Sequence, residues 1–417
     1  MPEATKINSP RFVLGILFFV ALFNYLDRMI LAILLEPIKA EFALSDTQLG
    51  LLTGLAFAMF YASFGIPLAR LADTGNRRSI IAWSLAAWSA LTMACGMAQS
   101  FIQLLVARIG VAIGEAGAVP PSHSLIGDYY PPEKRAGALA VFSLGSTVGY
   151  LIGFALGGFV AEHYGWRMAF LLVGFPGLLF ALVVRFCLAE PRLSEQHSVQ
   201  AADDSVWLAA RLLLAKRSYC FILAGFSFYA ILSYGATQWV ASFLIRTHGM
   251  GLAEVGFKYG MVVSLSTAAG VLAGGWLSNR LYDSDIRWSV WLPAIACLLG
   301  FPVSIAVFSL ADTSVVIMLM GVLGFSFGVT TPPAMAAVHL IAGERRRALA
   351  IAFVFLMTNL VGLGIGPVVI GAASDWLAKT YGDSALGIAI LSCHVLLLVA
   401  AVCFHVSGRS LQSDAEV

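Results

Sequence analysis

Long apolar stretches alternate with short polar segments along the whole chain, and this pattern predicts helices that cross a membrane. A helix needs about 20 predominantly apolar residues to span a bilayer, because its backbone amides must be satisfied internally where no water is present. Twelve stretches meet this criterion. They cover residues 12–35, 48–69, 79–98, 101–126, 136–161, 167–188, 218–245, 254–279, 288–310, 313–341, 347–373 and 384–406. These stretches are too long and too continuous for the alternating strands of a transmembrane barrel.

The composition agrees with this pattern. Charged residues make up 12% of the 417 residues, about half the share of roughly 25% that is usual in soluble domains, and 59% are apolar. The net charge of +2 gives no field that would attract nucleic acid. The six cysteines lie in apolar stretches without a C-x-x-C spacing, so we expect neither a metal site nor a cofactor.

The basic residues predict the orientation of the spans. If both termini are cytoplasmic, 18 of the 25 Lys and Arg residues lie on the inner side, five on the outer side and two inside the spans. Inner loops of membrane proteins carry an excess of Lys and Arg. We therefore expect a multi-pass protein of a prokaryotic inner membrane with both termini in the cytoplasm.

The two halves of the chain repeat a pattern. Pro121 precedes Arg135 by 14 residues, and Pro333 precedes Arg347 by the same interval, at an offset of 212. A second pair of motifs, around Asp73 and around Asn279, follows spans 2 and 8 at an offset near 206. Such repeats are typical of transporters whose site lies between the halves.

A polar stretch separates the repeats. The sequence thus predicts an all-α integral membrane protein of two pseudo-symmetric six-helix bundles with a central cavity between them. The predicted divisions are an N-terminal bundle at 1–188, a cytoplasmic linker at 189–217 and a C-terminal bundle at 218–417.

Several motifs resemble those of the major facilitator superfamily. The loop Arg70-Leu-Ala-Asp73-Thr-Gly-Asn-Arg77-Arg78 resembles its Gly-x-x-x-Asp-Arg-x-Gly-Arg-Arg signature, although Ala and Thr replace the first Gly and the first Arg. Glycines at 145, 149, 153 and 157 resemble its span-5 antiporter motif. Asn24-Tyr-Leu-Asp-Arg28 and Arg108-Ile-Gly-Val-Ala-Ile-Gly-Glu115 resemble the spinster subfamily, whose animal members export lysolipids and sphingoid lipids. The span-1 motif also resembles that of organic-anion symporters.

Four charges lie inside the spans, namely Asp27, Arg28, Arg108 and Glu115. Each costs about 2.5–3.5 kcal/mol at the bilayer centre unless it is paired or hydrated. The resemblance makes spans 1 and 4 neighbours, so we expect a reversible Asp27–Arg108 salt bridge that couples proton binding to conformation. The same pair could instead only neutralise two packed helices.

Glu115 follows Arg108 by seven residues and projects from nearly the same helix face. It could receive the proton, or it could simply be hydrogen-bonded to neighbouring hydroxyls. Arg28 could pair with Glu115 or with another helix.

We assign proton coupling to Asp27, Arg108 and Glu115. The expected substrate-binding residues are Arg108, Arg28, Asn24, Tyr25, Tyr229, Tyr234, Gln238 and Asn359. The expected cytoplasmic gate, which could alternatively be a solvated face, comprises Asp73, Arg77, Arg78, Asp128, Arg135, Glu344 and Arg347.

Charges in one half and aromatic or apolar surface in the other suit an amphipathic solute with a charged head. We therefore predict a monomeric, proton-linked secondary transporter of a lipid-like organic anion, working by alternating access. The alternative is a symporter of small hydrophilic anions such as sugar acids or carboxylates, for which we would expect more cationic residues in the second half. A membrane enzyme fits less well, since we identify no catalytic residues. A channel fits less well, since tandem halves with a charge pair between spans 1 and 4 favour alternating access.

Overall fold

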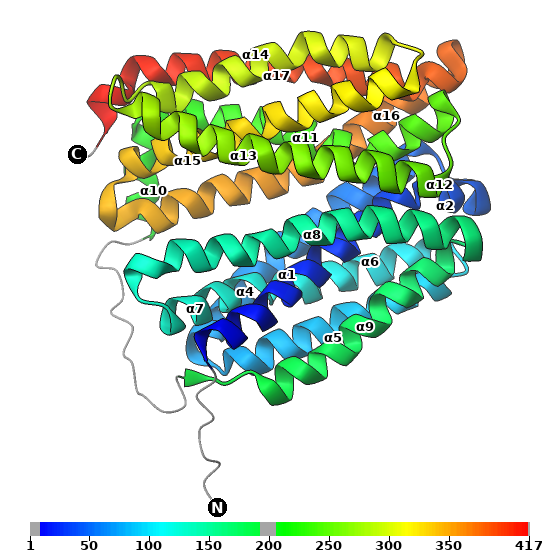
Figure 1. Ribbon diagram of the computed structural model, residues 1–417, viewed down its shortest axis with the longest axis horizontal. Helices are drawn as coiled ribbons and strands as arrows, with labels where there is room; N and C mark the ends of the chain where they lie inside the picture. The colour runs from blue at the N-terminus through cyan, green and yellow to red at the C-terminus, as the bar shows by residue number, and fades with distance from the viewer. Residues whose placement is uncertain (1–8, 192–205, 416–417) are drawn as a thin grey trace, which may run out of the picture. The chain divides into compact units, whose positions relative to one another are not determined.

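The protein is almost entirely helical. A computed structural model describes residues 9–191 and 206–415, and these ranges contain helices but no strand (Figure 1). Eleven helical stretches in them are long and apolar enough to cross a membrane. The last of these, Leu349–Asp414, has 66 residues and would be about 99 Å long if straight, roughly three times the apolar thickness of a bilayer. It turns at Gly382, where φ is +53°, and so provides two crossings. The predicted twelve-helix architecture is confirmed.

The helices of the first half end close to the predicted boundaries. They are α1 (Pro10–Ile33), α2 (Leu35–Phe42), α3 (Asp46–Gly50), α4 (Ala56–Thr74), α5 (Arg77–Met97), α6 (Phe101–Ala116), α7 (Val119–Tyr129), α8 (Pro132–Tyr164) and α9 (Trp166–Cys187). The predicted span 101–126 is interrupted between α6 and α7. Pro120 and Pro121 lie in the first turn of α7, where their missing N–H groups break no helical hydrogen bond.

The second half contains the remaining helices. They are α10 (Val206–Ala215), α11 (Arg217–His248), α12 (Leu252–Glu254), α13 (Gly260–Tyr282), α14 (Trp288–Ser309), α15 (Thr313–Met357), α16 (Gly364–Tyr381) and α17 (Ala385–Asp414). Gly343 has φ +62° inside α15 and divides it at the predicted boundary between spans 10 and 11. π-Helical turns occur at Leu51–Leu55, Val255–Tyr259 and Thr358–Leu363.

The contacts within the chain define two units. Unit 1 comprises residues 1–44, 56–199 and 251–257, and unit 2 comprises 45–55, 200–250 and 258–417. This partition departs from the sequence-based division because two short segments group with the opposite half. They begin at Ser45 and Gly251, which are 206 residues apart, the offset of the second repeated motif pair. A π-helical turn begins inside each segment, at Leu51 in the first and at Val255 in the second, so the repeat extends to local backbone geometry.

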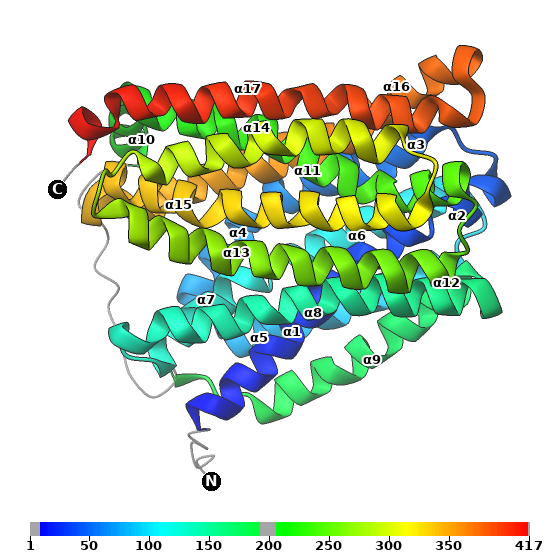
Figure 2. The ribbon, with the colours of Figure 1, turned by 45° about the horizontal axis from the view of Figure 1, so that its top comes forward.

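Close packing of α1 against α8 organises unit 1, where the two helices run side by side (Figure 2). A Cβ atom added to Gly145 would lie 2.3 Å from the carbonyl oxygen of Phe18, and one added to Gly149 would lie 2.3 Å from that of Leu22. Gly153 meets Leu26 in the same way. Glycines spaced by four therefore lie against α1 turn by turn, which is the packing that small residues allow between membrane helices.

We expect Gly149→Ala to lower the thermal stability of the protein by about 1–3 kcal/mol, because its new methyl group can be accommodated only if α1 moves. The measurement is the thermal unfolding midpoint of the purified protein in detergent. Gly15→Ala is the matched control in the same helix pair, since its Cβ would meet nothing within 4 Å. Equal midpoints for the two variants would contradict the packing described here.

Candidate functional site

Two buried ion pairs join α1 to α6 in unit 1. Arg28 Nε lies 2.6 Å from Glu115 Oε2, and Arg108 Nη1 lies 3.1 Å from Asp27 Oδ1. All four side chains are buried, with at most 10% of their surface exposed. The structure thus brings together the four charges that the sequence placed inside the spans, and each acid meets one base.

Helix α5 contributes a further contact to Asp27. The Thr92 hydroxyl donates a hydrogen bond to Asp27 Oδ2, the oxygen that does not face Arg108. Thr92 Oγ1 also lies 2.9 Å from the carbonyl oxygen of Trp88 in its own helix. Both carboxylate oxygens of Asp27 are therefore engaged by residues of neighbouring helices. Thr92 could not be identified from the sequence, because a Thr in an apolar span is common.

Several polar atoms in this cluster have no partner. The buried atoms without a hydrogen bond are Arg28 Nη2, Arg108 Nε, Glu115 Oε1 and both side-chain amide atoms of Asn24. A buried polar atom that is left unsatisfied costs about 1–3 kcal/mol. Three of these atoms are nitrogens that carry N–H groups, and two are acceptor oxygens. Such atoms need a water, a proton or a substrate group as a partner. The cluster is thus equipped to bind a polar or anionic group as well as a proton.

Aromatic rings cover the two guanidinium groups. Arg28 Cζ lies 4.7 Å from the ring centroid of Tyr61, 5.0 Å from that of Phe57 and 5.5 Å from that of Tyr25. Arg108 Cζ lies 5.4 Å from the Phe57 centroid. Cation–π contacts of this kind stabilise an arginine that has left water. Tyr25 was an expected site residue, whereas Phe57 and Tyr61 of α4 were missed.

A second cluster lies at the start of α5. The Arg77 guanidinium is fully buried and lies 2.5 Å from Glu190 Oε1 and 2.6 Å from Asp128 Oδ2. Glu190 Oε2 accepts the backbone N–H groups of Arg77 and Arg78 at 2.7 and 3.3 Å. A carboxylate at a helix N-terminus is stabilised by the helix dipole and by these free donors. Glu190 therefore holds the end of span 6 against the beginning of span 3.

The other expected gate residues have different environments. Arg135 donates from Nε to the carbonyl oxygen of Tyr130 at 2.9 Å, within its own segment. Arg347 is exposed in unit 2. The side chains of Asp73 and Glu344 lie outside the described residues. Glu190 is the residue that the sequence analysis missed, although its position directly after span 6, facing the basic inner loops, is a signal that could have found it.

The expected substrate residues of the second half lie in unit 2. The Tyr229 hydroxyl donates to the Phe327 carbonyl oxygen at 3.0 Å, and Asn359 Nδ2 donates to the Phe355 carbonyl oxygen at 2.8 Å. Gln238 is buried with Oε1 unpaired, and Tyr234 is half-buried. The hydrogen-bonding capacity of Tyr229 and Asn359 is thus partly used inside the bundle.

Unit 2 contains its own partly buried charge cluster around Asp46, which the sequence analysis missed. Both guanidinium Nη atoms of Arg246 donate to the Asp46 carboxylate at 2.7 and 2.8 Å, and Ser374 Oγ donates to it at 2.6 Å. The Asp375 carboxylate accepts the backbone N–H groups of Asp46 and Thr47 at 2.9 and 2.8 Å. These contacts fasten α3, the beginning of span 2, to α11 and α16.

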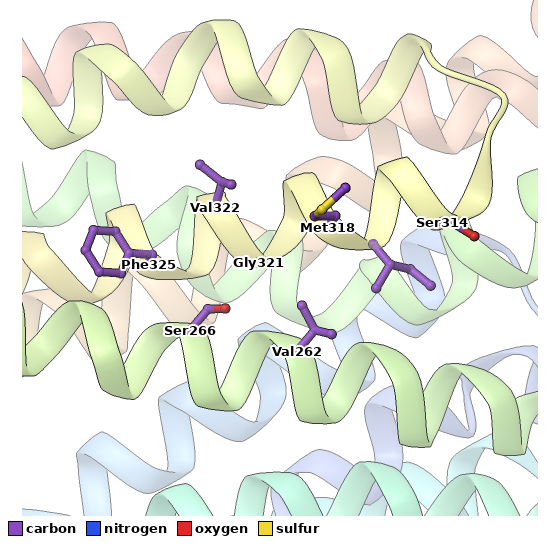
Figure 3. Close-up of a pocket in the computed structure, with 8 residues that line it drawn as sticks. Val262, Ser266, Ser314, Met318, Gly321, Val322 and Phe325 are labelled. Carbon is purple, nitrogen blue, oxygen red and sulfur yellow. The ribbon is translucent and has the colours of Figure 1, made fainter.

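The groove drawn in Figure 3 is apolar. It lies between α13 and α15 in unit 2 and has a volume of about 450 Å³. The groove is lined by Val262, Met318, Val322 and Phe325 together with small residues. No ionisable side chain faces the groove. In the described part of the chain, no three His, Cys, Asp or Glu side chains gather in a way that could hold a metal ion.

Comparison with known proteins agrees with this architecture. Residues 17–367 match the family model described as Major Facilitator Superfamily. The chain is 34% identical over 405 residues to an MFS-type efflux pump of Mycolicibacterium smegmatis, covering 96% of this chain and 93% of the relative. It is 23% identical over 413 residues to a hexuronate transporter of Bacillus subtilis, covering 97% of each. Among solved structures, a bacterial homologue of the human lysosomal transporter spinster, in an inward-facing and unoccupied conformation, matches 98% of each chain with 30% identity and a TM-score of 0.89.

We expect Glu190→Gln to destabilise unit 1 by about 1.5–3 kcal/mol, because it removes a charged hydrogen-bond acceptor from Arg77 and from the α5 N-terminus. Thermal unfolding in detergent measures the effect. Glu41→Gln is the control: its ion pair with Arg167 has the same 2.5 Å separation but is 37–41% exposed, and exposed pairs contribute little. The proposed role of burial is wrong if the two variants lose the same stability.

Proposed function

The chain belongs to the major facilitator superfamily of membrane transporters, and on this premise we propose that it moves an amphipathic or lipid-like organic anion by proton-coupled alternating access. The observation that carries the proposal is the buried four-charge cluster of unit 1 with its unpartnered polar atoms. A cluster that served only stability would be expected to satisfy its own hydrogen bonds, since partly satisfied buried networks are costly. Similarity to the sphingosine-1-phosphate transporter of Danio rerio, at 26% identity over 99% of this chain, supports the lipid-like class.

The substrate headgroup binds to the arginines in this proposal. Arg28 Nη2 and Arg108 Nε are the unpaired donors, and Asn24 offers an amide beside them. Arginine binds carboxylate and phosphate groups more strongly than a neutral donor does. The rings of Tyr25, Phe57 and Tyr61 provide an apolar rim. The expected substrate residues of the second half, Tyr229, Tyr234, Gln238 and Asn359, are uncharged, so the anionic headgroup is left to the arginines.

The proton binds to Asp27 in this proposal. Protonation removes the charge that holds Arg108, so the arginine becomes free to bind an anion or a different partner. Glu115 provides a second carboxylate in the same cluster and holds Arg28 by the same kind of bond. A ligand shifts a conformational equilibrium only as far as it prefers one state. If the Asp27–Arg108 ion pair is formed in one transport state and broken in the other, the proton binds the two states with different affinities.

The remaining clusters stabilise the two ends of the transport path. At the inner end we assign the gate to Arg77, Arg78, Asp128 and Glu190, together with the expected residues Asp73, Arg135, Glu344 and Arg347. At the other end, the Asp46–Arg246 pair holds the beginning of span 2 in unit 2, while the rest of that span belongs to unit 1.

We infer the location from the basic residues and from the relatives. The 18 of 25 Lys and Arg residues on one side favour cytoplasmic termini. The bacterial relatives favour a bacterial inner membrane. We propose that the monomer is the transporting unit.

The alternative substrate class is a small hydrophilic organic anion, such as a sugar acid. The hexuronate transporter of Bacillus subtilis supports it, although at a lower identity than the efflux pump. It predicts a substrate held by cationic groups on both halves. The partly buried charges described in unit 2 form the Asp46–Arg246 cluster, where the Asp46 carboxylate already holds the arginine.

Asp27→Asn tests the coupling. We expect proteoliposomes with this variant to lose the part of the flux driven by an imposed pH gradient while keeping exchange without a gradient. Asp285→Asn is the control, because it makes the same chemical change in an exposed loop ion pair with Arg287. Full gradient-driven transport by Asp27→Asn would rule out Asp27 as the proton site.

A series of binding measurements with single ligands tests the substrate class. Lysophospholipid, sphingoid phosphate and hexuronate are each added to the purified protein, and binding is measured as a rise in the unfolding midpoint. We expect stabilisation by the two lipids and a weaker response in Arg108→Gln. Stabilisation by hexuronate alone would favour the small-anion alternative.

A further inference from the structure

Helix α10 presents an apolar face that no part of its own unit covers. Its inner side packs through Ala209, Ala210 and Leu213, which are buried. On its outer side Trp207 is 80% exposed and Leu214 53% exposed. The outer face also carries Leu208 and Leu212, which are likewise exposed. Large apolar side chains gathered on one side of a short helix indicate a surface that meets another apolar phase.

The position of α10 identifies that phase. Figure 1 and Figure 2 both show it at the end of unit 2 where the C-terminus lies. The Lys216 ammonium group, directly after the helix, donates to the carbonyl oxygen of Ile341 at 2.6 Å, beside the break in α15 at Gly343. Arg217 then begins span 7. The helix is therefore held at the level where membrane spans end, which is the depth of the lipid headgroups.

The chemistry of the face matches that depth. Trp207, Arg211 and Leu214 follow one another at i, i+4 and i+7, so the guanidinium group lies between an indole ring and a leucine on the same side of the helix. These three residues line a shallow hollow together with Ala210 and Ala215. Tryptophan prefers the boundary between headgroups and acyl chains, and arginine there meets lipid phosphates.

We propose that α10 is an interfacial helix that docks on anionic phospholipids of the cytoplasmic leaflet. Trp207 and the leucines enter the boundary of the acyl chains, and Arg211 binds a lipid phosphate, with Lys216 and Arg217 adding positive charge. Because α10 is fastened to α15 through Lys216, the docking connects unit 2 to the leaflet. This proposal does not depend on which substrate the protein carries.

Spin labels on the full-length protein in nanodiscs test it. The cysteines that are not buried are first replaced by Ala, namely Cys187, Cys220, Cys393 and Cys403. A label is then placed by Leu208→Cys or Leu214→Cys, and its collision rates with oxygen and with a water-soluble nickel chelate are measured. Ser284→Cys, in an exposed loop, provides the aqueous control, and Leu298→Cys, exposed on span 9, provides the acyl-chain control.

We expect both α10 labels to be shielded from the nickel chelate relative to position 284 and to lie at a shallower depth than position 298. The shielding increases when phosphatidylglycerol is added to phosphatidylcholine, and Arg211→Gln abolishes this increase. Nickel accessibility equal to that at position 284 in both lipid mixtures would overturn the docking and leave α10 as a surface for a cytosolic protein. Shielding that does not respond to phosphatidylglycerol would overturn the assignment to anionic lipid.

Discussion

The structure depends on one constraint: a charge that enters the membrane must bring its partner with it. Arg28 and Asp27 are adjacent on α1, and they reach Glu115 and Arg108, which lie seven residues apart on α6. These two contacts leave α1 and α6 little freedom to slide or rotate, since a shift by one residue would separate both pairs. On its other side α1 meets the glycines of α8, where backbone approaches backbone and leaves no room for a side chain. The charges therefore fix the register of α1, and the glycines fix its distance from α8.

The sequence predicted much of this because hydrophobicity and charge act over short stretches of chain. Twelve spans, the break at Gly343 and the importance of the four intramembrane charges follow from the cost of placing polar groups in lipid. The span-4 interruption was missed, because prolines in a first helical turn leave the hydrophobicity unchanged. Partners such as Glu190 and Arg246 were missed for a different reason. Their contacts join residues 113 and 200 positions away, and a charge near the end of a span already has an ordinary explanation in topology.

The two repeats share a fold but differ in chemistry. Both halves begin their second span with a short segment that groups with the opposite unit and continues into a π-helical turn. In the Ser45 segment the contacts are charged, with Asp46 bound by Arg246 and Asp375 bound to backbone amides. In the Gly251 segment the Glu162 carboxylate accepts the backbone N–H of Ala253 at 2.7 Å. The two segments thus share a backbone path, while the side chains that bind them differ.

Proton coupling requires a group whose bonding partners differ between the transport states. The ion pairs described here each join residues of one unit, so a displacement of the units as rigid bodies does not by itself separate them. A proton changes the equilibrium only if some group exchanges its partner between states. Within the four-charge cluster and its neighbour Asn24, the unpaired atoms of Arg28, Arg108, Glu115 and Asn24 have hydrogen-bonding capacity to spare. The coupling we propose must therefore involve these atoms and a substrate or water that they hold in one state and release in the other.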